Sequence, residues 1–442
     1  MSIHQATAGS FDMLVEEGRK YIAGGVVSLN RKVDPAVVFR EGKGSKIYDV
    51  NGKEYIDYHA AFAPHLLGHN FDEVNDAVKA VIDRRISLIS SSTNELEIQL
   101  ARMLCETIPS LELIQITNTG SEATAHAIRL SRAFTGREHI VLMVGGYNGW
   151  HNEVARMVMP SLKALGHRIV AGEYPFIPSS SGIPEAVKKL VHCVNFNDLA
   201  SVEAVMKKYP VACVLTEPVL QNIGVVLPEP GYLKGLYDLC EKHGSLLVFD
   251  EVKTGFRSGL RGYQDVAGIK PHLSVFGKAI ANGYPLGIIG GRRDIMELFD
   301  APEPEKRVLI AGTYNAHPLN TAAAIATIEI LKRPEVYTHI SKVSQMLYDG
   351  LTTIFAEKGI AAVTIHNASA SCTYFCESVP KDLHDILEHH DFNFDRKYRV
   401  ALIEKGIYLI PITCKQTSVS YSHSVKDIEK TLETTRQVLG EL

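Results

Sequence analysis

From about residue 71 to residue 325, short apolar runs alternate with segments of helical periodicity. Strand-like runs are IVLMVGG, VACVLTEP and SLLVFDEV, and helical spacing occurs in SEATAHAIRLSRAF, EAVMKKY and YLKGLYDLCEKHG. Strands that alternate with helices in this way form a mostly parallel sheet covered by helices on both faces. The pattern therefore predicts an α/β fold whose ligands bind beyond the carboxyl ends of the strands.

The two ends of the chain predict further units. Residues 1–70 read as an N-terminal arm and part of a small domain, with a helical segment, FDMLVEEGRKYI, and two short strands joined at Asn51-Gly52, which is a strong hairpin signal. Residues 326–442 begin with the helical AAAIATIEILKR, end in the amphipathic KDIEKTLETTRQVLGEL, and read as a C-terminal small domain. Because 442 residues exceed one ordinary core, we expect residues 71–325 to form a separate, large domain.

Composition excludes several classes of function. The formal charge is −4, with both signs interspersed, so there is no basic stripe of the kind that nucleic acid requires. The first residues lack a basic flank followed by an apolar core, and no apolar run approaches the length of a membrane span. We therefore expect a cytoplasmic protein without nucleic-acid or membrane partners.

Cysteine and histidine patterns do not predict a metal site. The seven cysteines are scattered and lie mostly in apolar runs, which is typical of reduced, buried thiols. Cys372 and Cys376 lack the spacing and the second pair of ligands of a zinc site. His389 and His390 stand in a polar stretch and read as surface residues.

The stretch LSVFGKAIANGYPLG, residues 273–287, contains an isolated lysine. Lys278 is the only charged residue between Lys270 and Arg292. A buried ammonium without a partner is costly and tends to lose its proton, which leaves a nucleophilic amine. The alternative is a lysine whose stem crosses a buried segment and whose charge reaches water.

The segment TNTGSEATAHAIRLSRA, residues 117–133, runs from a turn into a helix. Gly120 and Ser121 stand at the start, where free backbone N–H groups, a hydroxyl and the helix dipole suit a phosphate; a simple N-cap is the alternative. The chain has neither a GxGxxG after its first strand nor a GxxxxGK[ST] motif. Dinucleotide and nucleoside triphosphate sites are therefore not predicted.

Three further motifs follow predicted strands or turns. Asp250 and Glu251 end the apolar run SLLVFDEV, where they face either a ligand or the next loop. GGYNGWH offers the flat rings of Tyr147 and Trp150, for stacking on a ligand or for packing. In GTYNAHPLN, Thr313 combines a hydroxyl with the N–H groups of a turn, which suits an anion.

In this order the motifs resemble the fold-type I pyridoxal phosphate enzymes. Within these the chain is similar to the class III aminotransferases, in the branch that contains glutamate-1-semialdehyde aminomutase. TNTGSEAT, LLVFDEVKTGFRSG, LSVFGKAIANGYPLGIIGGRRDIME and GTYNAHPLN carry the resemblance. It implies a large domain with a mostly parallel seven-stranded sheet flanked by helices, and a smaller α/β domain built from the two termini.

The resemblance also implies a role for individual residues. Lys278 forms the Schiff base with pyridoxal phosphate and then moves a proton, and Asp250 keeps the pyridine nitrogen protonated. The remaining cofactor contacts are the phosphate residues Gly120 and Ser121, the stacking Tyr147, Val252 on the opposite face of the ring, and Glu217 and Asn222 near the ring hydroxyl.

The resemblance further implies a homodimer with shared active sites, because Thr313 reaches the phosphate site of the neighbouring subunit. In GGVVSLNR, Arg31 is the candidate that binds the substrate carboxylate through a bidentate fork. Lys415 stands where the aminomutase carries a glutamate. The chain also lacks the glycine-rich loop that the aminomutase has after its aromatic turn.

These two departures favour an aminotransferase that moves an amino group from a carboxylate-bearing donor to a 2-oxo acid by a ping-pong mechanism, with pyridoxamine phosphate between the half-reactions. An isomerase on the same scaffold, an aminomutase or an amino-acid racemase, is the alternative, and release of a keto product distinguishes the two. A non-catalytic binding protein and a nicotinamide dehydrogenase are weaker alternatives: the first leaves the lysine and the acid without a role, and the second lacks its glycine motif.

Overall fold

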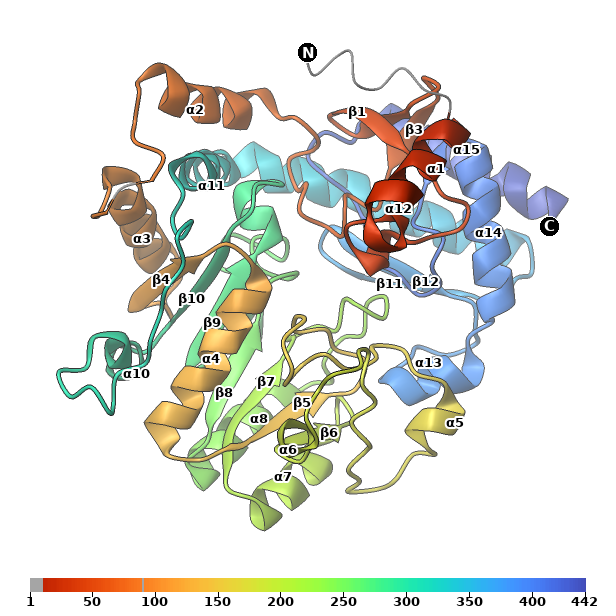
Figure 1. Cartoon of the computed structure of the whole chain (residues 1–442). Coiled ribbons are helices and arrows are strands. Elements are labelled where there is room, and N and C mark those ends of the chain that lie inside the picture. The colour runs from red at the N-terminus through yellow and green to blue at the C-terminus, as the bar shows by residue number, and fades with distance from the viewer. Residues whose placement is uncertain (1–10, 90) are drawn as a thin grey trace.

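The computed structural model describes residues 11–89 and 91–442. A sheet with the strand order β4-β10-β9-β8-β7-β5-β6 forms the centre of the larger part of the molecule (Figure 1). Its strands are β4 (Leu113–Thr117), β5 (His139–Met143), β6 (Val191–Val194), β7 (Val211–Thr216), β8 (Leu246–Asp250), β9 (Leu273–Gly277) and β10 (Gly287–Gly291). Only β10 runs antiparallel to its neighbours, so the prediction of a mostly parallel, seven-stranded sheet is confirmed.

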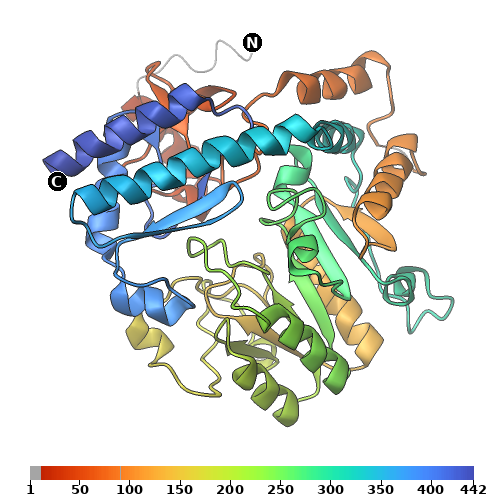
Figure 2. The ribbon, with the colours of Figure 1, turned by 180° about the vertical axis from the view of Figure 1, so that it is seen from behind.

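Helices cover both faces of this sheet. Helix α4 (Gly120–Thr135) packs on β7, β9 and β10, and α8 (Tyr232–His243) packs on β7 and β8 from the other side (Figures 1 and 2). Because both faces are covered, central strands bury every residue, as in VACVLT of β7, and read as continuous apolar runs. The shorter helices of this part are α5 (Leu162–Leu165), α6 (Glu185–Lys188), α7 (Leu199–Lys208), α9 (Tyr263–Ala267), η4 (Lys278–Ala281), α10 (Arg293–Met296) and η5 (Glu297–Asp300).

The two ends of the chain join in a second, smaller part. One sheet has the order β1-β2-β3-β13, in which β13 of the C-terminal segment pairs in parallel with β3 of the N-terminal segment. A second sheet has the order β11-β12-β14. The strands are β1 (Phe39–Lys43), β2 (Lys46–Asp49), β3 (Glu54–Asp57), β11 (Val363–Asn367), β12 (Ala370–Tyr374), β13 (Ile407–Tyr408) and β14 (Thr417–Ser418).

Helices complete the molecule at both ends of the chain. The long α12 and α15 lie side by side across the smaller part, as Figure 2 shows. The helices are α1 (Phe11–Tyr21), η2 (Ala23–Gly25), η3 (Leu29–Arg31), α2 (Asp72–Asp83), α3 (Glu95–Thr107), α11 (Pro318–Leu331), α12 (Pro334–Glu357), α13 (Leu383–His389), α14 (Phe392–Glu404) and α15 (Val425–Glu441). The domain boundaries at 70/71 and 325/326 stay predictions; the second falls inside α11.

Local predictions at the N-terminus agree with the structure. Helix α1 matches the predicted helical segment from Phe11 onward; its preceding residues lie outside the described part of the chain. The Asn51-Gly52 dipeptide joins β2 and β3, whose residues Tyr48 and Glu54 face each other across the hairpin. Gly52 has a φ of +82°, a conformation that its missing side chain permits.

One prediction about the histidines is wrong. His389 is exposed as expected, but His390 is buried, because the chain turns inward after α13. Nδ1 of His390 accepts from the Phe375 N–H at 3.1 Å, and Nε2 lies 3.2 Å from Asp395. Asp395 also accepts from Arg399 and from the Cys414 N–H. Hydrogen bonds within the protein therefore account for this cluster.

The cysteines are all free thiols, and every one except the half-buried Cys105 is buried, as predicted. Across residues 11–89 and 91–442, the structure contains no helix with the length and apolar character of a membrane span.

Candidate active site

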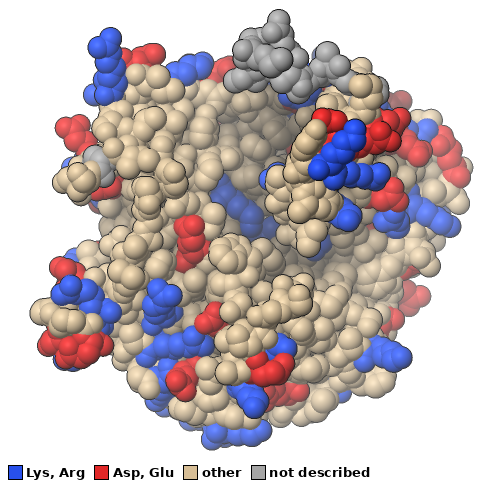
Figure 3. Space-filling view, viewed as in Figure 1, with Lys and Arg blue, Asp and Glu red and all other residues tan. Residues whose placement is uncertain are grey.

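A cavity of about 500 Å³ lies at the carboxyl ends of the central strands, where the two parts of the molecule meet. The space-filling view shows the hollow, with lysine and arginine atoms in its depth (Figure 3). Every predicted site residue except Thr313 lines it: Arg31, Gly120, Ser121, Tyr147, Glu217, Asn222, Asp250, Val252, Lys278 and Lys415. The fold therefore brings together residues that are almost 400 positions apart in the sequence.

Lys278 is the first residue after β9 and begins the short helix η4. Its φ of +50° is left-handed, a conformation that costs a residue with a side chain about 1 kcal/mol or more. The side chain is half-buried, and desolvation lowers its pKa from the ordinary lysine value; the nearby Asp250 and Glu217 counteract only part of the shift. The structure thus supports the interpretation of Lys278 as a desolvated amine that loses its proton more readily than an exposed lysine does.

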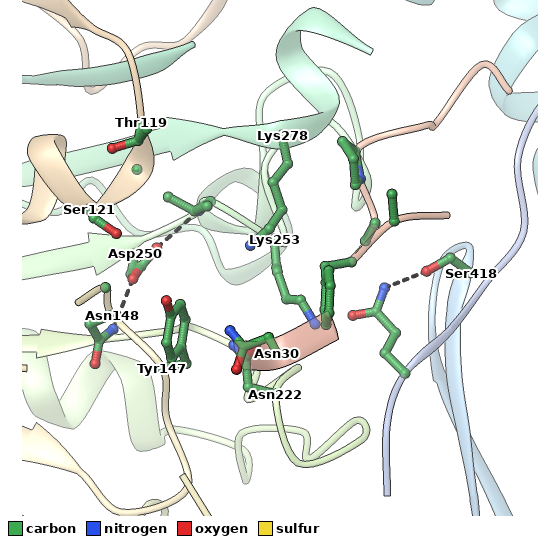
Figure 4. Close-up of a pocket in the computed structure, with 18 of the residues that line it drawn as sticks. Asn30, Thr119, Ser121, Tyr147, Asn148, Asn222, Asp250, Lys253, Lys278 and Ser418 are labelled. Carbon is green, nitrogen blue, oxygen red and sulfur yellow. Dashed lines mark hydrogen bonds between the residues drawn. The ribbon is translucent and has the colours of Figure 1, made fainter. Parts of the chain in front are cut away.

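Asp250 is the last residue of β8, beside β9. Its carboxylate accepts from Nδ2 of Asn148 at 2.8 Å and from the Val252 N–H at 3.1 Å (Figure 4). Burial, together with the charge of Glu217, raises the pKa of Asp250 to about 7. Within the described residues no lysine, arginine or histidine forms an ion pair with it. A ligand that brings a positive charge to this carboxylate would offset the cost of burying it.

The neighbouring Glu251 faces the other way. Its carboxylate accepts from the N–H groups of Tyr263 and Gln264, both at 2.9 Å, and from the Thr254 hydroxyl. It therefore holds the loop after β8 in place. Of the two acids at the end of this strand, only Asp250 faces the cavity.

The start of α4 forms one wall of the cavity. Thr119 is the N-cap, and its hydroxyl accepts from the Glu122 N–H at 3.2 Å. Gly120 has no room for a side chain, since a Cβ atom there would lie 2.7 Å from Cγ2 of Val252. The Ser121 hydroxyl is on the cavity side, as Figure 4 shows. Free N–H groups, a hydroxyl and a close backbone approach suit a phosphate at this helix start.

Glu217 organises the opposite wall. Its Oε1 accepts from the Tyr147 N–H and from Nδ2 of Asn222, both at 2.9 Å, and its Oε2 accepts from the Gln221 N–H at 3.0 Å. The carboxylate therefore fixes the loop that carries Tyr147 and orients the Asn222 side chain. Tyr147 and Val252 both line the cavity, so it has an aromatic and an aliphatic wall.

Two predicted residues belong to the outer side of the cavity. Arg31 ends η3, is largely exposed and lines the opening. Lys415 is half-buried, and its Nζ donates to the Asn222 carbonyl at 2.6 Å. Both put basic side chains in the cavity wall, and their role in binding an anionic substrate stays a prediction.

Thr313 and Trp150 lie elsewhere. Thr313 is exposed and does not line this cavity; its role at the phosphate site of a neighbouring subunit stays a prediction. Trp150 is 69% exposed and is not part of the cavity wall, so of the two aromatic residues in GGYNGWH only Tyr147 lines the site.

Several polar residues of the cavity wall were not predicted from the sequence, among them Asn148 and Lys253. Asn148 binds Asp250, and Lys253 is a buried cation that lines the cavity. Each is next to, or one residue away from, a predicted site residue, in GGYNGWH and in DEVKTG. That adjacency was a signal, but an asparagine beside a glycine is also typical of a plain turn.

Comparisons with known proteins show the family of the chain. The family model Aminotransferase class-III matches residues 28–433. A curated relative, glutamate-1-semialdehyde 2,1-aminomutase of Sulfurihydrogenibium azorense, is 37% identical over 431 residues, which are 96% of this chain and 97% of that protein.

Solved structures show the same fold. An omega-transaminase from Sphaerobacter thermophilus superimposes with a TM-score of 0.90 at 27% identity, covering 100% of this chain and 99% of that one. A glutamate-1-semialdehyde aminomutase from Pseudomonas aeruginosa PAO1, in complex with PMP, has a TM-score of 0.86 at 23% identity and covers 98% and 94% of the two chains.

Proposed function

Because the chain belongs to the class III aminotransferase family and is a pyridoxal phosphate-dependent enzyme, we propose that it moves the amino group of a small, carboxylate-bearing substrate. One observation carries the proposal. Asp250, which is buried, and Lys278, which is half-buried, stand at the ends of the neighbouring strands β8 and β9 and line the same cavity.

The described residues fit pyridoxal phosphate. Asp250 is a buried carboxylate without an ion-pair partner among them, and a protonated pyridine nitrogen would supply one. Gly120 and Ser121 at the start of α4 would hold the phosphate, and Tyr147 and Val252 would hold the two faces of the ring. When bound, the cofactor supplies an electron sink for the bond that breaks next to the amine.

Lys278 acts as the base in this proposal. Since burial favours its neutral amine, Nζ accepts a proton from the substrate carbon and returns it to another position. Arg31 at the opening orients the substrate by binding its carboxylate.

The first candidate reaction is an isomerisation in which the amine migrates within one substrate. The curated relative named as an aminomutase supports it, at 37% identity over nearly the whole chain. We therefore put the isomerase, which was the alternative expected from the sequence, ahead of the aminotransferase, which was the first expectation.

The aminotransferase is the second candidate, favoured by a specific residue. Lys415 puts a cation in the cavity wall at the place where the resemblance implies a glutamate. The likeness to an omega-transaminase over the whole chain also supports it. A change of charge in the cavity wall changes how strongly the cavity retains a charged intermediate. This matters because an aminotransferase must release its first product before the second substrate binds.

The test is the visible absorption of the purified holoenzyme, recorded with glutamate 1-semialdehyde and with a panel of α-, β- and ω-amino acids. Isomerised product without free keto acid supports the aminomutase. Stoichiometric keto product, with loss of the visible band until an oxo acid is added, supports the aminotransferase. No spectral change with any amine would refute both.

We further propose a homodimer in which Thr313 contacts the cofactor phosphate of the neighbouring subunit. Thr313 is exposed, and large apolar side chains beside it are exposed too: Leu309 is 68% and Tyr314 is 58% exposed. Sedimentation gives the assembly state. A mixed dimer of Lys278→Ala and Thr313→Ala subunits tests the shared site, because one of its two sites then keeps both residues intact.

A further inference from the structure

The cavity has an excess of basic side chains. Its wall contains four basic side chains, Arg31, Lys253, Lys278 and Lys415, and two carboxylates, Glu217 and Asp250. Neither carboxylate is paired with a lysine. Glu217 is bound by backbone N–H groups and by Asn222, and Asp250 is bound by Asn148 and the Val252 N–H.

Lys253 and Lys415 form a pair at one side of this wall. Nζ of Lys253 donates to the Gln221 carbonyl at 2.6 Å, and Nζ of Lys415 donates to the carbonyl of the next residue, Asn222, at 2.6 Å. Because consecutive Cα atoms are about 3.8 Å apart, the two ammonium groups lie within roughly 10 Å of each other. In the described part of the chain, neither lysine has a carboxylate within the 4.0 Å of an ion pair.

Two desolvated ammonium groups at this spacing are costly. Lys253 is 8% exposed and Lys415 is half-buried, and desolvation lowers the pKa of both lysines. For Lys253 the charges of Lys278 and Lys415 lower the pKa further, and the charge of Glu217 counteracts part of the shift for both lysines. The backbone carbonyl that each ammonium group contacts provides only a partial negative charge, which compensates less than a carboxylate would. An anion between them would be attracted by both ammonium groups, could hydrogen-bond to either of them, and would offset the cost of desolvating them.

This pair is separate from the predicted phosphate site. In Figure 4 the Lys253 side chain extends away from Thr119 and Ser121, toward Asn30 and Asn222. The phosphate residues and the lysine pair therefore lie at different sides of the cavity, so one ligand anion is not expected to serve both.

From this arrangement we infer that Lys253 and Lys415 bind a second carboxylate, and that the substrate is an amino dicarboxylic acid or the corresponding oxo acid. The inference rests on the proposed function, in which Arg31 binds the other carboxylate. Lys253 and Lys415 are then residues that determine specificity, while Lys278 and Asp250 carry out the chemistry.

The test is calorimetric binding of unreactive acids to the holoenzyme, in chloride buffer at neutral pH. Glutarate carries two carboxylates, and valerate has the same carbon chain with one. We expect the wild type to prefer glutarate by 10-fold or more. Lys253→Met and Lys415→Met should each weaken glutarate binding by about 10- to 100-fold, the range of one hydrogen bond to a charged group, and reduce the preference over valerate.

Matched variants separate this effect from general damage. Lys234 is exposed on α8 and paired with Asp238, so Lys234→Met should keep the preference for glutarate. Arg31→Ala should weaken both acids. If Lys253→Met does not fold, as judged by its thermal transition, the half-buried Lys415→Met decides the question alone.

Three results would overturn the inference. The first is equal affinity of the wild type for glutarate and valerate. The second is a preference for glutarate that survives in a folded lysine variant. The third is a shifted cofactor absorption band in Lys253→Met with an unchanged preference, which would assign this lysine to the cofactor. Because glutarate carries no amine, these outcomes are independent of the proposed function, which fails only if amines leave the spectrum unchanged.

Discussion

Asn148 should control the pH at which the enzyme binds its cofactor. Its Nδ2 donates to Asp250 at 2.8 Å, and both side chains are buried. A hydrogen bond to a charged group contributes about 1.5 to 3 kcal/mol when it is buried. Asn148→Leu removes this bond from the ionised carboxylate and should raise the pKa of Asp250 above its value of about 7 by roughly 1 to 2 units.

The sign of the effect follows from the raised pKa. The folded apoprotein holds a proton on Asp250 more tightly than the unfolded chain does. This group therefore destabilises the fold as the pH rises from about 4, the pKa of an aspartate in the unfolded chain, toward about 7, the pKa of Asp250 in the folded protein. A cofactor whose pyridine nitrogen is protonated relieves the cost only when Asp250 is ionised. Cofactor affinity should therefore rise with pH through the pKa of Asp250.

The assay is titration of the apoenzyme with pyridoxal phosphate across a pH series, followed by visible absorption. The midpoint of the acidic limb should lie near pH 7 in the wild type and higher in Asn148→Leu. Asp250→Asn is the control: this variant should bind the cofactor weakly, and its cofactor affinity should no longer rise with pH in this range. Equal midpoints in the wild type and in a folded Asn148→Leu would refute the reasoning.

Three other predictions concern the same site. Lys278→Ala should abolish turnover while keeping the melting temperature within a few degrees; catalysis at the wild-type rate would remove this lysine from the mechanism. Arg31→Ala should raise KM for carboxylate substrates by at least about 10-fold and leave simple amines unaffected, as steady-state kinetics with matched amines will show. Gly120→Ala places a Cβ atom 2.7 Å from Cγ2 of Val252. The substitution should lower the free energy of unfolding, measured in urea, by about 1 to 3 kcal/mol and should weaken cofactor binding. A neutral effect on both would contradict the tight contact.

The centre of the candidate site was predictable because Asp250, Lys278 and Glu217 end or directly follow strands. Asp250 ends one apolar run and Lys278 follows another, and parallel strands end at the same edge of a sheet. Lys253 was not found, although it is near Asp250, because only the folded chain shows that its amine is buried and directed at the Gln221 carbonyl. His390 was predicted at the surface for the same reason: its polar neighbours in sequence are not its neighbours in space.

The sequence by itself determined which segments are strands and helices, since apolar periodicity and turn residues act over a few positions of the chain. It also placed the lysine, the acid and the phosphate turn at the ends of those segments. Only the tertiary structure decided that β10 reverses direction between β4 and β9, that Arg31 and Lys415 share a cavity with Lys278, and which charges lack a partner there. Burial and electrostatic environment depend on contacts between distant segments, and a local pattern carries no record of those contacts.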